Sequence, residues 1–176
     1  MLPLVKNIII IVSALILLAA GFYFIQKSAP AYLQTLEPKT ELKNLALAPD
    51  FELTDLNGQK IKLSDYRGKK AVMVFWTSWS EDSLKQLKTF DDYSKFPSAK
   101  NAVILAVNSL EEKATAKKIK TDQNLNLVIL LDQEGAVGES YELGVLPLTV
   151  IIDKGGLIEK RIIGPATTDV IFSNSQ

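Results

Sequence analysis

The fold is decided by the stretch Phe75-Trp76-Thr77-Ser78-Trp79-Ser80-Glu81-Asp82-Ser83. Residues 71–76 form a continuous apolar run, which predicts a strand that is buried on both faces and therefore central in a sheet. Beyond the stretch, Leu84, Leu87 and Phe90 repeat at helical spacing and predict a helix. The stretch is therefore a junction at which a buried strand runs directly into a helix start.

The segments on either side of this junction alternate between strands and helices. Residues 51–63 predict a hairpin that turns at Asn57-Gly58. Further strands are expected over residues 102–107, 127–131, 148–152 and 157–163, and further helices over residues 110–123, over residues 136–143 and from Asp169 onwards. This order predicts one α/β domain over residues 45–176, a sandwich with a mixed central β-sheet.

The composition excludes several classes of chemistry. The 176 residues contain neither cysteine nor histidine, which removes thiol redox chemistry, disulfides and any mechanism with an imidazole base. The 20 basic residues balance the 20 acidic ones, so no basic field is present to attract nucleic acid. We therefore expect no nucleic-acid partner, no metal and no cofactor.

The N-terminal region predicts a membrane anchor. Residues 8–25 carry no charge and lie between Lys6 and Lys27. As a helix they would span about 27 Å, close to the thickness of the hydrocarbon core of a bilayer. A cleaved signal peptide is the alternative, with Ala29-Pro30-Ala31 as a weak cleavage site, but its apolar region would be shorter. We favour an uncleaved single-pass helix.

The organisation that follows from this anchor has three parts. Residues 1–27 are the anchor and residues 28–44, which are polar and contain two prolines, are a linker. Residues 45–176 are then the folded domain. Because almost nothing precedes the helix, we expect the N-terminus inside the cell and the domain on the extracytoplasmic side of the cell membrane.

Four motifs carry a resemblance to a known family. In order they are Ala-Pro-Asp-Phe-Glu-Leu-Thr-Asp-Leu-Asn-Gly at 48–58, Leu-Ser-Asp-Tyr-Arg-Gly-Lys at 63–69, Val-Phe-Trp-Thr-Ser-Trp at 74–79 and Leu-Pro-Leu-Thr at 146–149. They resemble the redoxin branch of the thioredoxin superfamily, and within it the membrane-anchored TlpA/ResA-like thiol-disulfide oxidoreductases. The likeness covers residues 45 to about 172 and implies a thioredoxin-like fold.

The sequence departs from that family at the active site. The family's helix opens with Trp-Cys-x-x-Cys, whereas Ser80 and Ser83 stand at the two cysteine positions here. Pro147 matches the family's cis-proline, which lies beside the cysteine pair and presents an edge to extended substrates. The resemblance therefore implies a thioredoxin-type site that has kept its frame and lost both sulfurs.

A serine cannot replace the missing thiols. A helix N-terminus lowers the pKa of a cysteine enough to favour the thiolate, which then attacks a disulfide. The helix dipole contributes about 0.3–1 kcal/mol, far too little to ionise a hydroxyl, and an oxygen cannot form the mixed disulfide. Thiol-disulfide exchange by this chain alone is excluded, and no residue is assigned a catalytic role.

Two other interpretations of the serines remain. Ser80 could be a hydrolytic nucleophile, but without histidine its base would have to be a lysine or a carboxylate, and Glu81 at the adjacent helical position points elsewhere. The interpretation that we favour is helix capping, in which Ser78 and Glu81 form a capping box and Ser80, Asp82 and Ser83 satisfy free N–H groups.

The junction also offers a binding surface. We expect Trp79 to be partly exposed beside the proline edge formed by Leu146 and Pro147, where it could contact a protein or peptide client. Glu81 and Asp82 complete the candidate binding residues. The leading hypothesis is a redox-inactive, membrane-anchored protein that binds or scaffolds within envelope thiol-disulfide handling or cytochrome c maturation.

Three alternatives stay open. The first is an enzyme that uses the same cleft without thiols, which predicts a perturbed Glu81 or Asp82. The second is a peroxiredoxin-like protein that has lost its peroxidatic cysteine, suggested by the Thr77-x-x-Ser80 spacing. The third is a purely structural membrane protein that pairs through small residues of its anchor.

Overall fold

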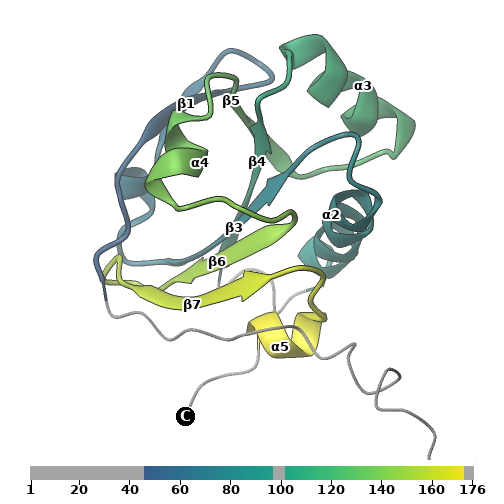
Figure 1. Cartoon of the computed structure of the whole chain (residues 1–176). Helices are drawn as coiled ribbons and strands as arrows, with labels where there is room; N and C mark the ends of the chain where they lie inside the picture. Colours follow the sequence, from purple (N-terminus) through teal and green to yellow (C-terminus); the bar gives the residue numbers. More distant parts are fainter. Residues whose placement is uncertain (1–45, 97–101, 173–176) are drawn as a thin grey trace, which may run out of the picture. The chain divides into compact units, whose positions relative to one another are not determined.

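A seven-stranded mixed sheet forms the centre of the domain in the computed structural model, which describes residues 46–96 and 102–172. The strands are β1 (Glu52–Asp55), β2 (Lys60–Lys62), β3 (Lys70–Trp76), β4 (Ala102–Ser109), β5 (Val128–Asp132), β6 (Leu148–Ile152) and β7 (Ile158–Ile163). They are arranged in the order β2-β1-β5-β4-β3-β6-β7 (Figure 1). β3, β4 and β5 are parallel, and the flanking strands pair antiparallel.

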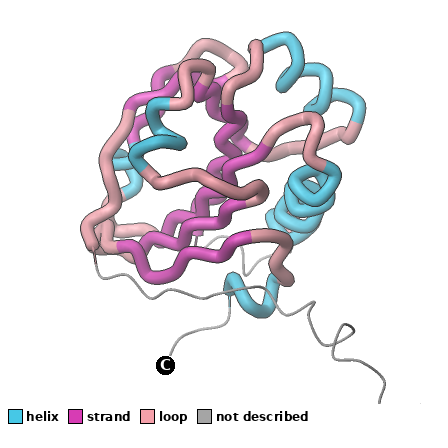
Figure 2. Tube along the Cα trace, in the orientation of Figure 1, coloured by secondary structure: helices cyan, strands magenta, loops and turns pink. Residues whose placement is uncertain are grey.

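Helices cover both faces of this sheet (Figures 1 and 2). They are α2 (Glu81–Ser94), α3 (Lys113–Asp122), α4 (Ala136–Ser140), α5 (Thr168–Phe172) and the short 3-10 helix η2 (Leu63–Tyr66). One half of the core joins the sheet to α2, α3 and α5, and includes Trp76 and Phe90. The other half joins the opposite face of the sheet to α4 and η2, and includes Phe75 and Tyr141. The expected α/β sandwich with a mixed sheet is confirmed.

The local signals of the sequence explain the elements nearest the site. Residues 71–76 are all buried, as the continuous apolar run predicts for a central strand. Asn57-Gly58 forms the turn of the first hairpin, with Gly58 at φ +88°, and the carboxylate of Asp55 accepts hydrogen bonds from the N–H groups of Asn57 and Gln59, both at 2.8 Å. The side chain of Asp55 therefore fixes the turn.

Two helices are shorter than predicted. The helix expected over residues 136–143 ends at Ser140. The helix expected over residues 110–123 begins at Lys113 and ends at Asp122. Leu110 has φ +57°, a left-handed conformation that cannot continue into an α-helix. Glu111 instead turns back to the β3–α2 loop, with which it forms hydrogen bonds. These non-local contacts delay the helix start.

The predicted anchor and linker, residues 1–27 and 28–44, lie outside the described residues. Within residues 46–96 and 102–172, no helix is long and apolar enough to cross a membrane. The three-part organisation of the chain stays a prediction.

Candidate functional site

The junction between β3 and α2 places both serines at the start of the helix. Ser80 is the N-cap of α2, and its Oγ accepts a hydrogen bond from the backbone N–H of Ser83 at 3.2 Å. Ser83 lies in the first turn and is fully buried, whereas Ser80 is half-buried. The two positions that the resemblance assigned to cysteines therefore adjoin each other at one helix N-terminus.

The predicted capping box at Ser78 and Glu81 is wrong. The cap belongs to Ser80, because the helix begins only at Glu81 and the N–H and hydroxyl of Ser78 are both engaged elsewhere. Glu81 is exposed and pairs with Lys85 at 2.8 Å. The hydrogen bond from Lys85, reinforced by its charge, lowers the pKa of Glu81. This is an ordinary surface ion pair, and it gives no support to a role for Glu81 as a proton-transfer group.

A second carboxylate, which the sequence analysis missed, holds the junction in place. Glu111 accepts hydrogen bonds from the backbone N–H of Ser78 at 2.8 Å, from the hydroxyl of Ser78, and from Nδ2 of Asn108 at 2.7 Å. Asn108 is fully buried near the end of β4, beside Trp76 at the end of β3. Glu111 thus clamps the loop that carries Trp79 to the neighbouring strand.

A proline loop forms the other side of the junction. The peptide bond between Leu146 and Pro147 is cis, as the family resemblance implies. Pro147 is buried and Leu146 is half-buried, and the next residue, Leu148, pairs with Phe75 of β3. Trp79 keeps 74% of its surface exposed. The structure therefore brings the predicted residues Trp79, Leu146 and Pro147 to one end of β3 and β6, and their most accessible member is Trp79.

Buried polar atoms without a hydrogen-bond partner gather under this junction. Within the described part of the chain they include Nε1 of Trp76, Oγ1 of Thr77, Oγ of Ser83, Oδ1 of Asn108, Oγ of Ser109 and Oγ1 of Thr149. These residues come from the adjoining ends of β3, β4, β6 and α2. An unpaired buried polar atom costs about 1–3 kcal/mol.

The remaining chemistry of the described domain is limited. In residues 46–96 and 102–172, no three carboxylates are grouped so that they could hold a metal ion. Ser78 has a carboxylate partner in Glu111, but both groups also serve as structural links between two loops. The arrangement can hold a rigid loop and present an aromatic side chain.

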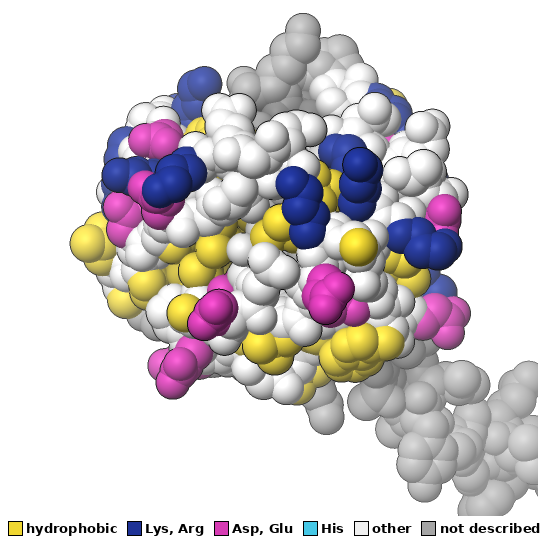
Figure 3. Space-filling model, turned by 90° about the horizontal axis from the view of Figure 1, so that it is seen from above, with side chains coloured by type: hydrophobic (Ala, Val, Ile, Leu, Met, Phe, Trp, Pro, Cys, Tyr) yellow, Lys and Arg dark blue, Asp and Glu magenta, His cyan; other side chains and the backbone are white. Residues whose placement is uncertain are grey.

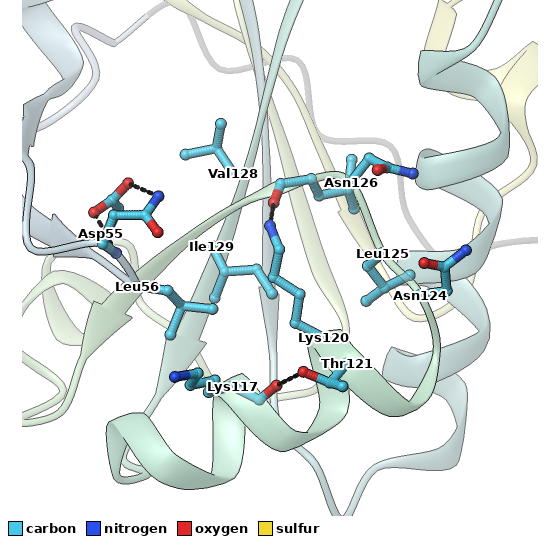
Figure 4. A pocket seen from close by; sticks show the side chains of 12 residues that line it. Asp55, Leu56, Lys117, Lys120, Thr121, Asn124, Leu125, Asn126, Val128 and Ile129 are labelled. Atoms are coloured by element: carbon cyan, nitrogen blue, oxygen red, sulfur yellow. Dashed lines mark hydrogen bonds between the residues drawn. The ribbon is translucent and has the colours of Figure 1, made fainter.

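A hollow of about 550 Å³ lies away from the junction, between the β1–β2 turn, α3 and the start of β5 (Figure 4). Leu125 and Ile129 line its apolar part. Two of its polar groups already have partners, since Nζ of Lys120 donates to the carbonyl of Leu127 at 2.6 Å and the carboxylate of Asp55 accepts from its own turn. None of the predicted site residues lines this hollow.

Comparisons with known proteins agree with this geometry. The model of the AhpC/TSA family matches residues 46–161. The thiol-disulfide oxidoreductase ResA of Geobacillus kaustophilus (strain HTA426) is 34% identical over 157 residues, which cover 89% of this chain and 87% of that protein. ResA of Bacillus subtilis (strain 168) is 32% identical over 124 residues, covering 70% of this chain and 69% of that protein.

Two solved structures are also similar to this chain. The exposed lipoprotein thioredoxin Etrx1 of Streptococcus pneumoniae strain TIGR4 is 33% identical, with a TM-score of 0.61 over 71% of this chain and 96% of that one. StoA of Bacillus subtilis, at 24% identity, supports the fold alone, with a TM-score of 0.63 over 71% of this chain and 95% of that one. The chain belongs to the AhpC/TSA redoxin family and is related to the ResA thiol-disulfide oxidoreductases, with serine at both positions where they carry the active-site cysteines.

Proposed function

We propose that this protein is a membrane-anchored, extracytoplasmic relative of ResA that has lost thiol-disulfide exchange and uses the retained site to hold a protein or peptide client. The single observation that carries the proposal is that the helix start and the proline loop of the site are kept while both cysteines are absent. Ser80 still caps α2 and accepts the N–H of Ser83, and Pro147 is still cis, yet the sequence contains no cysteine. The client would belong to envelope thiol-disulfide handling or to cytochrome c maturation.

The exposure of Trp79 supports binding at this frame. A tryptophan with 74% of its surface in solvent gives little to the stability of the domain, since most of its apolar area stays in water. Tryptophan is one of the side chains that most often dominate protein interfaces. The clamp formed by Glu111 and Ser78 fixes the preceding residue, so the loop that presents Trp79 is already ordered before a client binds.

The anchor is proposed from the sequence. The uncharged residues 8–25 have the length of a membrane-spanning helix, and the polar residues 28–44 would set the domain away from the bilayer. Labelling with a membrane-impermeant reagent tests the topology. A single cysteine introduced at the exposed Lys154 should react in intact cells, whereas labelling only after lysis would contradict an extracytoplasmic domain.

Restoring both cysteines tests whether the frame is intact. The variant Ser80→Cys/Ser83→Cys should reduce insulin disulfides, because a thiolate at Ser80 would receive the N–H that now reaches its hydroxyl. The single variant Ser80→Cys is the matched control, since it lacks the second thiol that resolves the mixed disulfide. A folded double variant that stays inactive would show that the site has diverged beyond its sulfurs.

Affinity capture tests the client proposal. The full chain and its Trp79→Ala variant are crosslinked in native membranes and compared by their captured proteins. Phe96→Ala is a matched control, because Phe96 is also an exposed aromatic side chain, at 60%, but follows the C-terminal end of α2. Loss of a partner in Trp79→Ala alone is expected. Identical partners for all three proteins would contradict binding at the junction.

A further inference from the structure

Three exposed apolar side chains lie on loops at the same end of the sheet. Trp79, Leu110 and Val145 expose 74%, 70% and 56% of their surfaces. They follow β3, follow β4 and precede β6, and the ends of these strands adjoin one another in the sheet. We call these three residues and the acidic residues around them the loop face.

Hydrogen bonds hold the loops of Trp79 and Leu110 in fixed positions. Glu111, which follows Leu110, accepts the N–H of Ser78, which precedes Trp79, at 2.8 Å. The N–H of Leu110 donates to the carbonyl of Asp132 at 2.9 Å. These two loops are therefore ordered before a partner binds, so the entropic cost of ordering them is small.

The backbone of the loop face is also strained. Leu110 has φ +57° and Glu142 has φ +50°, and both side chains are largely exposed. A non-glycine residue in this conformation costs about 1–3 kcal/mol, and Leu110 does not recover this by burying its side chain. Strained residues of this kind concentrate at binding sites.

Acidic side chains surround the apolar ones. Five exposed carboxylates belong to the loops and helix starts at this end: Glu81, Asp82, Glu112, Glu134 and Glu142. Three cations lie near these five carboxylates: Lys85 pairs with Glu81 at 2.8 Å, Arg161 approaches Glu142 only at 4.0 Å, and the exposed Lys113 follows Glu112 at the start of α3. Figure 3 looks onto this end of the molecule: hydrophobic and acidic side chains lie together in the lower part of the view, and lysine or arginine side chains lie at its right edge and centre.

We propose that the loop face binds a polypeptide segment that combines lysine or arginine with apolar side chains. The apolar residues of the segment would cover Trp79, Leu110 and Val145, and its cations would meet the surrounding carboxylates. The acidic residues of the loop face would repel acidic segments, and this repulsion makes the site selective. This inference rests on the client-binding function proposed above and names the chemical class of that client.

The test uses the full chain in an uncharged detergent and three labelled peptides of about nine residues, long enough to cross the loop face when extended. One peptide alternates lysine with leucine, one alternates glutamate with leucine, and one alternates lysine with serine. Fluorescence anisotropy should give a dissociation constant for the lysine-leucine peptide at least about tenfold lower than for the other two. Raising NaCl from about 0.05 M to about 0.5 M should weaken that binding.

Two charge variants locate the binding site. The variant Glu112→Gln/Glu134→Gln/Glu142→Gln neutralises three of the five acidic residues of the loop face. It should weaken binding of the lysine-leucine peptide about tenfold. The control Glu52→Gln/Asp92→Asn/Asp122→Asn changes the net charge equally by removing exposed acids that form ion pairs elsewhere on the domain, and should leave binding unchanged.

The outcomes separate this inference from the function on which it rests. Equal affinity for the lysine-leucine and glutamate-leucine peptides overturns the charge preference. If that equal binding disappears in Trp79→Ala, client docking at the junction still stands. Failure of the lysine-leucine peptide to bind, or equal weakening by the two charge variants, overturns the inference, and affinity capture with Trp79→Ala decides the docking function independently.

Discussion

The backbone N–H of Ser83 donates to Oγ of Ser80 at 3.2 Å, so the two residues at the former cysteine positions still interact directly. Their environments differ, however. Ser80 is half-buried and its oxygen satisfies a helix N–H group, whereas the hydroxyl of Ser83 is fully buried and has no partner within the described residues. The first serine stabilises the helix start, and the second places a polar atom where a less polar thiol would fit better.

The first prediction concerns the cap. Ser80→Ala removes the acceptor for the N–H of Ser83 and should lower the free energy of unfolding by about 1 kcal/mol. Urea unfolding of the full chain in detergent, followed by circular dichroism, measures the change. Ser80→Asp is the control, because an aspartate can cap the helix equally well and should retain most of the stability. Equal destabilisation by both variants would mean that Ser80 is not the cap.

The second prediction is that the same substitution at Ser83 stabilises the domain. Ser83→Ala removes a buried hydroxyl that has no partner and should raise the free energy of unfolding by about 1 kcal/mol. The same urea experiment compares it with Ser80→Ala, which is chemically the identical substitution. A destabilised Ser83→Ala variant would show that the hydroxyl forms a hydrogen bond, for example to an internal water.

The third prediction concerns the clamp that orients the binding loop. Glu111→Ala leaves the N–H of Ser78 and the buried amide of Asn108 without their acceptor, and should destabilise the domain by about 2 kcal/mol. Fluorescence anisotropy should also show greater mobility of Trp79, while the buried Trp76 provides a constant background. Glu112→Ala is the control, because the side chain of this adjacent exposed glutamate makes no capping hydrogen bond. Unchanged anisotropy in Glu111→Ala would contradict the orienting role.

The sequence was sufficient to predict the frame of the site. The apolar run at residues 71–76 predicted the central strand, and the resemblance predicted that Pro147 is cis and that Ser80 and Ser83 adjoin at the helix start. These features depend on short stretches, in which local pattern and a shared family motif carry the information. The exposure of Trp79 follows from the same reasoning, since it stands between the buried strand and the helix.

The role of Glu111 could not be predicted in the same way. Its contact with Ser78 joins residues 33 positions apart, and nothing in the composition of either loop specifies it. A signal existed, because an acidic residue just after a buried parallel strand lies at the same sheet end as the junction. The same contact withdraws Ser78 from the helix, which explains why the N-cap lies at Ser80 and not at Ser78.

The last prediction concerns stability at low pH. Burial would raise the pKa of the Asp55 carboxyl, but the hydrogen bonds from Gln59 and Asn57 outweigh this and lower it. A lowered pKa in the folded state means that the carboxylate stabilises the domain above the ordinary aspartate pKa of about 4, and that this contribution is lost as the pH falls through the folded value. Asp55→Asn should therefore reduce stability at pH 6 more than at pH 3. Urea unfolding at the two pH values measures the difference, with the exposed Asp169→Asn as the control. A pH-independent effect of Asp55→Asn would show that the turn depends on the shape of the side chain and not on its charge.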